Sequence, residues 1–214
     1  MEAAPAVAVV IGLQVALAVA SHTEDWTTWQ FHWWIWLIPI APELALLLSV
    51  ALKRPHRRLE QMGLRREAVL TLTGLVSLAN ALLIFVVIAS LIQGDERSGT
   101  QLLLKAGCVW GTNVIAFALW YWALDRGGPV RRWQRDAPLP DFQFPQMENP
   151  QFARPGWMPQ LLDYLYVSFT NSIAFSPTDA MPLTRRAKLL MLAESVTSSL
   201  TILLVAARAV NIFK

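Results

Sequence analysis

Residues 166–179 read Tyr-Val-Ser-Phe-Thr-Asn-Ser-Ile-Ala-Phe-Ser-Pro-Thr-Asp, and this polar stretch interrupts an otherwise apolar part of the chain. We expect a short re-entrant helix over residues 157–170, irregular backbone over residues 171–179 and a long apolar helix over residues 183–213. In lipid, irregular backbone is tolerated only where protein or a water-filled cavity satisfies its free peptide groups. The sequence therefore predicts that residues 171–179 line the pathway of a membrane protein.

The composition of the whole chain indicates a polytopic membrane protein. Its 214 residues are 55% hydrophobic and 15% charged, with a mean hydropathy of +0.40, which excludes an ordinary soluble domain. The ten tryptophans fit this class because tryptophan concentrates where a membrane meets water. The pI near 9.4 comes from basic residues in short loops beside apolar spans, so it indicates topology and not nucleic-acid binding. The single cysteine, Cys108, excludes an intramolecular disulfide and a cysteine metal cluster.

Five apolar segments are long enough to cross a bilayer as helices. They cover residues 4–20, 33–52, 68–92, 102–124 and 183–213. Pro39 and Pro42 are expected to bend the second of them. The predicted fold class is an all-α membrane protein with five transmembrane helices plus a re-entrant pore helix.

The C-terminal part of the chain resembles the pore module of tetrameric potassium channels. Tyr166, Ser168 and Phe169 fall on the end of that family's pore helix, and residues 174–179 fall on its filter motif Thr-Val-Gly-Tyr-Gly-Asp. The family's inner-helix pattern is matched by Pro182, Ala187, Lys188, Glu194, Thr197, Ala207 and Arg208. The chain also looks like bacterial membrane proteins of unassigned function that carry an altered pore segment.

This resemblance implies that the chain is divided into two parts. Residues 1–93 would hold three peripheral transmembrane helices, and residues 94–214 would form a pore-like module. The module would contain, in order, an outer helix over 101–124, a Pro-rich cap over 125–156, the re-entrant helix over 157–170, the filter-like segment over 171–179 and the inner helix over 183–213. Phe142, Phe144 and Phe152 give the cap apolar side chains to bury.

The filter-like segment lacks the residues that select potassium. Ser176 and Thr178 replace both filter glycines, and Pro177 replaces the aromatic residue between them. A potassium filter coordinates the ion with stacked backbone carbonyls, and this geometry relies on the freedom of glycine to take positive φ. Because proline fixes its own φ near about −65° and restricts the residue before it, we do not expect a potassium-selective filter.

The resemblance implies an ion channel or channel-like pore in the bacterial cytoplasmic membrane, built as a homotetramer and not selective for potassium in the usual way. The alternative is a non-conducting tetrameric scaffold or partner subunit that retains the pore architecture. A secondary carrier is less favoured because no inverted repeat is visible. None of these readings names a permeant ion.

Four copies of the filter-like segment would stack amide, hydroxyl and carboxylate groups into rings, and such rings can select ions. The candidate residues of this constriction are Asn171, Ser172, Ala174, Phe175, Ser176, Pro177, Thr178 and Asp179. The alternative is a plug, in which the Asn, Ser and Asp side chains bond to nearby backbone as they do in turns.

Three charged residues within the predicted spans are the candidates for intramembrane functional groups: Glu43, Lys105 and Glu194. Glu194 lies eleven residues past Leu183, which places it roughly 16 Å into the membrane, a depth at which a carboxyl group is a functional candidate. The alternative for Glu194 is a bond to the back of the pore helix. Glu43 is a candidate for a proton relay or for an ion pair with Lys105, or else for a structural acceptor of a bond from a neighbouring Ser or Asn.

The distribution of positive charge predicts the orientation, because Lys and Arg in short loops accumulate on the cytoplasmic side. Fourteen of the eighteen Lys and Arg would share the face of the filter-like segment. They are Lys53, Arg54, Arg57, Arg58, Arg65, Arg66, Arg126, Arg131, Arg132, Arg135, Arg154, Arg185, Arg186 and Lys188. This count places the mouth and the N-terminus in the cytoplasm, whereas the mouth of a potassium-channel filter is extracellular.

No pattern in the chain indicates catalysis. His22, His32 and His56 lack metal-ligand spacing, and neither a Gly-rich phosphate loop nor the spacing of a hydrolase triad occurs. We therefore expect no enzyme activity and no cofactor. The expected partners are the lipid bilayer and further copies of the chain, with no nucleic acid.

Overall fold

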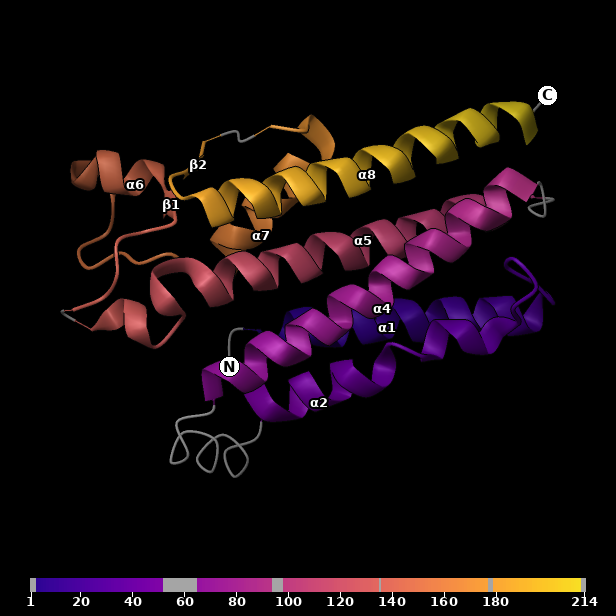
Figure 1. Cartoon of the computed structure of the whole chain (residues 1–214), viewed down its shortest axis with the longest axis horizontal. Coiled ribbons are helices and arrows are strands. Elements are labelled where there is room, and N and C mark those ends of the chain that lie inside the picture. Colours follow the sequence, from indigo (N-terminus) through magenta and orange to yellow (C-terminus); the bar gives the residue numbers. More distant parts are fainter. Residues whose placement is uncertain (1–2, 52–64, 94–97, 135, 177–178, 213–214) are drawn as a thin grey trace.

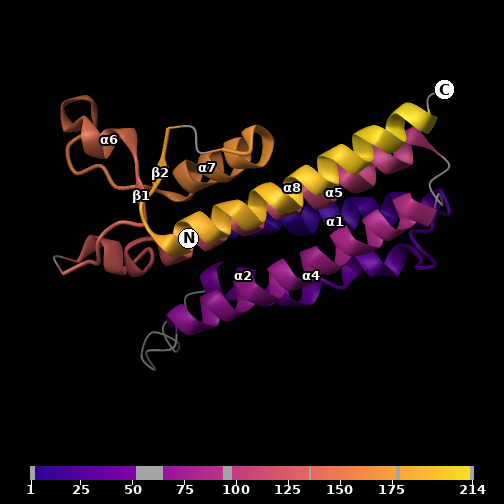
Figure 2. The same cartoon turned by 45° about the horizontal axis from the view of Figure 1, so that its top comes forward.

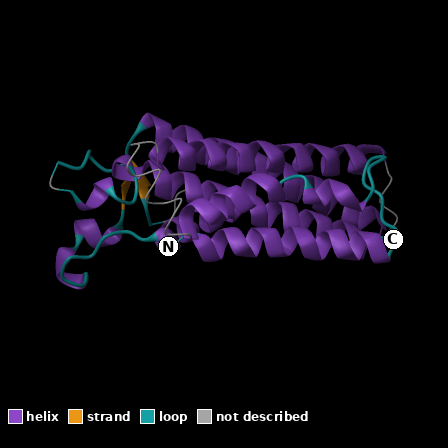
Figure 3. Cartoon of the chain, turned by 90° about the horizontal axis from the view of Figure 1, so that it is seen from below, coloured by secondary structure: helices purple, strands orange, loops and turns teal. Residues whose placement is uncertain are grey.

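The computed structural model of the chain describes residues 3–51, 65–93, 98–134, 136–176 and 179–212, and most of these residues lie in helices. The long helices run side by side as an elongated bundle with the two termini at opposite ends (Figures 1 and 3). Within the described ranges, four helices are long and apolar enough to cross a membrane. The predicted helical fold is confirmed, with four helices long and apolar enough to cross a membrane where five spans were expected.

The four long helices are α1 (Ala4–Thr23), α4 (Arg65–Gln93), α5 (Gly99–Leu124) and α8 (Arg185–Ile212). Shorter helical elements lie between them: η1 (Trp33–Leu37), α2 (Ile40–Ala51), η2 (Asp125–Gly127), η3 (Arg131–Trp133), α6 (Pro145–Glu148), η4 (Pro150–Phe152) and α7 (Leu161–Ala174). Two short strands, β1 (Phe142–Gln143) and β2 (Met181–Pro182), form an antiparallel pair.

The second predicted span, residues 33–52, is not one continuous α-helix. It consists of the 3₁₀ helix η1 and the twelve-residue helix α2, with Ile38 and Pro39 between them. Pro39 and Pro42 have no N–H group to donate, so the regular hydrogen-bond ladder of an α-helix cannot run through this region. The prolines therefore interrupt the segment instead of only bending it.

Helix α5 is the centre of the bundle. It packs against α1, α4, α7 and α8, and it is the most buried of the four long helices, whereas α8 is the least buried. Helices α1, α2 and α4 lie on one side of α5, and α7 and α8 lie on the other (Figures 1 and 2). The start of α4, the segment from η2 to β1 and the start of α8 all lie at one end of the bundle (Figure 1).

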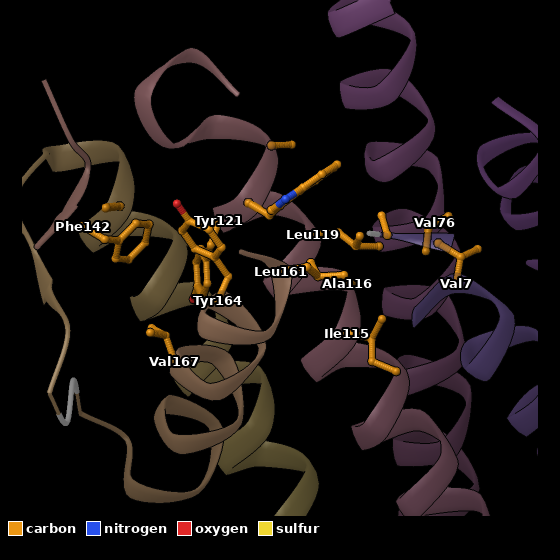
Figure 4. Close-up of a cluster of buried hydrophobic side chains, with 14 of the residues drawn as sticks. Val7, Val76, Ile115, Ala116, Leu119, Tyr121, Phe142, Leu161, Tyr164 and Val167 are labelled. Atoms are coloured by element: carbon orange, nitrogen blue, oxygen red, sulfur yellow. The ribbon is translucent and has the colours of Figure 1, made fainter. Parts of the chain in front are cut away.

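One buried apolar cluster joins the two sides of α5. Figure 4 shows Tyr121, Phe142 and Tyr164 together beside α7, while Leu119 and Val7 lie toward α1 and α4. The ring centroids of Tyr121 and Phe142 are 5.0 Å apart. Residues on opposite sides of α5 thus pack against different neighbouring helices, which explains why α5 is the most buried of the four long helices.

The outer faces of the long helices are also apolar, as expected where lipid replaces water as the solvent. Exposed large apolar residues lie on α1, α4 and α8: Val9, Leu13, Val15, Val19, Leu75, Leu78, Leu82, Phe85, Val196, Leu200 and Leu203. A helix that is apolar on both its packed and its outer faces is typical of a membrane span.

The predicted cap over residues 125–156 contains the short elements η2, η3, β1, α6 and η4. Phe142 and Phe144 are buried against α5 and α7 as expected, but Phe152 is 84% exposed. Phe142 and Phe144 lie at and beside β1, whose pairing with β2 holds them against Tyr121 and Tyr164. Phe152 follows in η4 and has no ring contact of this kind within the described part of the chain.

Candidate functional site

Helix α7 and the chain after it make a turn that begins and ends at the same end of the bundle. Near the start of α7, Tyr164 donates to Asp125 at the C-terminal end of α5 (2.6 Å), and further along Ser168 reaches the carbonyl of Val114 (2.7 Å). Helix α7 therefore runs antiparallel to α5. The chain then returns to β2, which pairs with β1 close to Asp125.

Helix α7 begins four residues later than predicted, at Leu161 instead of Trp157. The reason is a capping box, in which the side chains of Gln160 and Asp163 each accept a bond from the other residue's backbone N–H. The Gln160 N–H to Asp163 Oδ2 distance is 2.7 Å. Such reciprocal capping satisfies two of the free N–H groups of a helix start and fixes its position.

Helix α7 also ends later than predicted, because Asn171 and Ser172 belong to the helix and not to irregular backbone. The Ser172 hydroxyl donates to the Phe169 carbonyl one turn earlier (2.8 Å), which is compatible with a continuous helix. The helix stops at Phe175, whose φ of 54° is left-handed and whose N–H donates to the carbonyl of Asn171. This is the ordinary way in which a helix terminates, usually with glycine at that position.

The predicted constriction residues separate into two groups. Asn171 and Ser172 are buried inside the single chain, whereas Ala174, Phe175, Ser176 and Asp179 are exposed. Pro177 and Thr178 lie outside the described residues. Because they are buried, Asn171 and Ser172 are not available to form a ring around an axis. The exposed part of the segment starts at Ala174.

Glu194 connects α8 to both α5 and α7. Its Oε2 accepts bonds from the Tyr121 hydroxyl (2.5 Å) and the Asn171 amide (2.7 Å), and its Oε1 is hydrogen-bonded to the Ser168 hydroxyl. Both carboxyl oxygens thus have partners, and Glu194 is fully buried. This is the geometry expected from the structural alternative for Glu194, a bond to the back of the pore helix.

Asn171 extends the same network along α8. Its amide nitrogen also lies 3.0 Å from the Met191 carbonyl, and its oxygen accepts from the Ser195 hydroxyl (3.2 Å). A polar group buried without partners is costly, and here each polar atom of the Asn171 side chain has one. The residue that we expected to face a pathway instead holds α7 against α8.

A second group of charged residues fixes the end of the bundle where the α7 turn begins and ends. Asp141 accepts from the Thr184 hydroxyl (2.5 Å) and pairs with the Arg186 guanidinium, whose Nε is 2.6 Å away. Asp141 is buried and Arg186 is half-exposed. The pair ties the segment before β1 to the first turn of α8.

Arg132 and Asp125 are joined through Tyr164. The Arg132 guanidinium donates to the Tyr164 hydroxyl (2.9 Å) and to the carbonyls of Pro159 and Trp122, and the Tyr164 hydroxyl donates to Asp125. Burial, and next the charge of Asp125, raise the pKa of Tyr164 well above its usual range, so the hydroxyl keeps the proton that it donates. All three side chains are buried.

Sequence reasoning missed these anchoring residues, which are Tyr121, Asp125, Arg132, Asp141 and Tyr164. Three of the five, Asp125, Arg132 and Asp141, lie in the cap, where charged residues are most often solvated. The one signal in the sequence was the position of Asp125. It directly follows the apolar end of α5, where a carboxylate needs hydrogen-bond donors.

Glu43 and Lys105 have separate partners in the structure. The Lys105 ammonium donates to the carbonyl of Thr27 (2.7 Å), between α1 and η1. Glu43 accepts from the Gln14 amide of α1 (2.7 Å). The donor to Glu43 is thus a glutamine, where the structural alternative had named a Ser or Asn.

Comparison with known protein families, with curated proteins and with solved structures gives no match.

Proposed function

We propose that the chain is one subunit of a channel-like pore in the bacterial cytoplasmic membrane, with α7 as a re-entrant pore helix. One observation carries the proposal: α7 enters the bundle along α5, ends in a left-handed residue, and is followed by a chain that returns to the end where α7 began. With fourteen residues, α7 is about 21 Å long, which is less than the ~30 Å of a hydrocarbon core. A helix of this length is too short to cross the membrane, so the chain after it turns back within the membrane.

The residues proposed to line the constriction are those exposed after the helix, Ser176 and Asp179 foremost. Copies arranged around an axis would present rings of hydroxyl and carboxylate groups, which favour cations. Selection by stacked carbonyls as in potassium channels is not proposed, because Ser176 and Pro177 do not have the backbone freedom of glycine.

The proposed assembly is a homotetramer, supported by an apolar stripe on the outer face of α7. Its members recur at helical spacing and are 46–74% exposed: Leu162, Tyr166, Phe169 and Ile173. Helix α7 is proposed to lie inside the assembly and not against lipid, so another copy of the chain would cover this stripe. The exposed Leu189 and Leu192 on the neighbouring helix α8 would belong to the same interface.

The second candidate function is a non-conducting scaffold with the same architecture. It is favoured by the burial of Asn171 and Ser172, which removes two polar residues from the proposed lining. The remaining segment begins with the apolar side chains of Ala174 and Phe175, and Phe175 is 44% exposed. Four phenylalanine rings at an axis would exclude water and block ions.

Ion flux into liposomes separates the two functions. The purified protein is reconstituted and K⁺, Na⁺, H⁺ and Cl⁻ gradients are imposed in turn. A channel gives flux that Ser176→Trp abolishes and that the matched Ser98→Trp, at an exposed serine directly before α5, leaves unchanged. Absence of flux in every gradient, from protein that is folded and tetrameric, supports the scaffold. Protein that stays monomeric in detergent and in liposomes contradicts both.

A further inference from the structure

The interruption between η1 and α2 lies next to a buried acidic residue that the proposed pore does not use. Glu43 is in the first turn of α2 and is 1% exposed. Because residue 42 is proline, the Ile38 carbonyl loses the donor that it would have in a regular helix. Figure 1 shows the break in the ribbon between the two helical pieces. Interrupted backbone at membrane depth is tolerated only where protein or a cavity satisfies it.

Glu43 lies at mid-depth of the bundle, as its partner on α1 shows. Gln14, whose amide nitrogen is 2.7 Å from Glu43 Oε1, is close to the middle of the twenty-residue helix α1. At a rise of about 1.5 Å per residue, each end of α1 is roughly 15 Å away. Gln14 is also 1% exposed. The pair is therefore far from water in either direction.

The two side chains leave two acceptor atoms without partners. Glu43 Oε2 and Gln14 Oε1 are both buried, and neither has a hydrogen-bond partner within the described part of the chain. They belong to the same two planar groups, the Glu43 carboxyl group and the Gln14 amide group, whose other polar atoms form the Gln14–Glu43 hydrogen bond. A single proton on Glu43 satisfies both, because a carboxylic acid and a carboxamide can form a reciprocal pair in which each group donates once and accepts once.

An ionised Glu43 would have only one donor in this apolar environment. The N-terminal end of α2 favours a negative charge, but this contribution is small compared with the cost of burying an ion that is not fully paired. Ionisation would also leave the Gln14 oxygen without a donor. Glu194 differs, because both of its oxygens have polar partners.

Within the described residues, the hydrogen-bond partner of the Glu43 carboxyl group is Gln14, and no basic side chain pairs with it. On α5, the Cys108 thiol lies beside Thr112 and within electrostatic range of Glu43, and the Lys105 ammonium one turn away donates to Thr27. The ionisable residues of α1 and α4 lie in their terminal turns: His22, Arg65, Arg66 and Glu67. On α2 itself Glu43 is the one ionisable residue.

We propose that Glu43 and Gln14 form a proton-binding site between α1 and α2, in which Glu43 holds an exchangeable proton that it donates to the Gln14 oxygen. This proton holds α2 packed against α1. Release of the proton leaves unpaired acceptors and a charge at the interface, so it loosens α2 at the interruption beside Pro39. Since the site binds the proton in the packed state, the packing of α1 against α2 is strongest at low pH and weakens as the pH rises.

Infrared spectroscopy tests the proton directly. A protonated buried carboxyl group has a carbonyl band separate from that of carboxylates, and we expect this band in the native protein in liposomes. Glu43→Gln should remove the component that belongs to Glu43, and Glu194→Gln should leave that component in place. Identical spectra for the native protein and Glu43→Gln in the protonated-carboxyl region would overturn the proposal.

Thermal unfolding gives a second readout that does not depend on assigning a band. Glu43→Gln carries a permanent N–H donor where the proton would be, so it keeps the reciprocal pair at every pH. The difference in midpoint between Glu43→Gln and the native protein should grow in favour of the variant as the pH rises, and the exposed Glu148→Gln should show no such trend. A constant difference across the pH range would contradict the site even if both proteins fold.

Discussion

The Glu194 carboxyl group of α8 accepts a hydrogen bond from the amide of Asn171 in the last turn of α7, at 2.7 Å. The two residues are 23 positions apart, and the bond is buried between the helices. Glu194 also accepts from Tyr121 of α5, so one carboxyl group fixes the depth of α7 relative to two long helices. The position of the proposed constriction thus depends on a residue that does not line it.

Truncation of Glu194 should destabilise the bundle by about 2–4 kcal/mol, since interhelical hydrogen bonds in membranes contribute roughly 0.6–1.7 kcal/mol each and several are lost together. Glu194→Gln should cost less, because its carbonyl still accepts from Asn171 or Tyr121. Denaturant titration in mixed micelles measures both. The exposed Glu148→Ala serves as the control and should stay within about 0.5 kcal/mol of the native protein. Equal losses for Glu194→Ala and Glu148→Ala would mean that the network carries no stability.

Removal of the Tyr164 hydroxyl should cost about 1–3 kcal/mol, because Asp125 and Arg132 are buried and lose the group that connects them. Tyr166 is two residues away on the same helix and is 52% exposed, so Tyr166→Phe is a matched control with little expected effect. Unfolding monitored by tryptophan fluorescence distinguishes the two variants. If Tyr166→Phe lowers the free energy of unfolding more than Tyr164→Phe does, the Tyr166 side chain would instead lie in an interface between copies.

Neutralisation of Asp141 should release the segment before β1 from α8. Asp141→Asn weakens bonds to Thr184 and Arg186 at once, and it should cost more than Arg186→Gln because Asp141 is buried while Arg186 is half-exposed and solvated. Limited proteolysis checks this, with faster cleavage between residues 142 and 160 in Asp141→Asn. Asp136→Asn, an exposed neighbour in the same segment, should be cleaved at the native rate.

Neutralisation of Asp179 tests the charge of the proposed mouth. If the carboxylates form a ring, Asp179→Asn should lower the ratio of cation to anion permeability, measured as a reversal potential under a salt gradient. Asp25→Asn is an equivalent change just after the C-terminal end of α1, which lies at the end of the bundle opposite the start of α8 (Figure 1). We expect a shift in the first variant that exceeds the shift in the second. An unchanged ratio in Asp179→Asn would remove this residue from the pathway.

Hydrophobicity alone predicted the long helices well. The predicted spans over residues 4–20, 68–92, 102–124 and 183–213 lie on α1, α4, α5 and α8, with differences of a few residues at their ends. The length of such a span follows from the length of its apolar run, which can be read directly from the sequence. The span over residues 33–52 was wrong as one continuous helix, because composition does not show how far two prolines disrupt the backbone.

The boundaries of α7 needed tertiary information. Asn171 and Ser172 have low helix propensity and favour turns, so the sequence predicted that the helix ends before them. In the structure the Asn171 side chain is bonded to α8, which compensates for its weak propensity. The partner of Glu43 could not be predicted for the same reason, since Gln14 belongs to a different helix and nothing in the local pattern links the two residues.

The bonds that α7 makes to α8 have a consequence for the order in which the protein is assembled. Its polar side chains Ser168 and Asn171 find partners on α5 and α8, and α8 is synthesised after α7. When residue 174 is added to the growing chain, Glu194 has not yet been translated, so the bonds of Ser168 and Asn171 to α8 cannot yet form. The final docking of α7 therefore waits for α8, and α7 reaches its position only once α8 is in place.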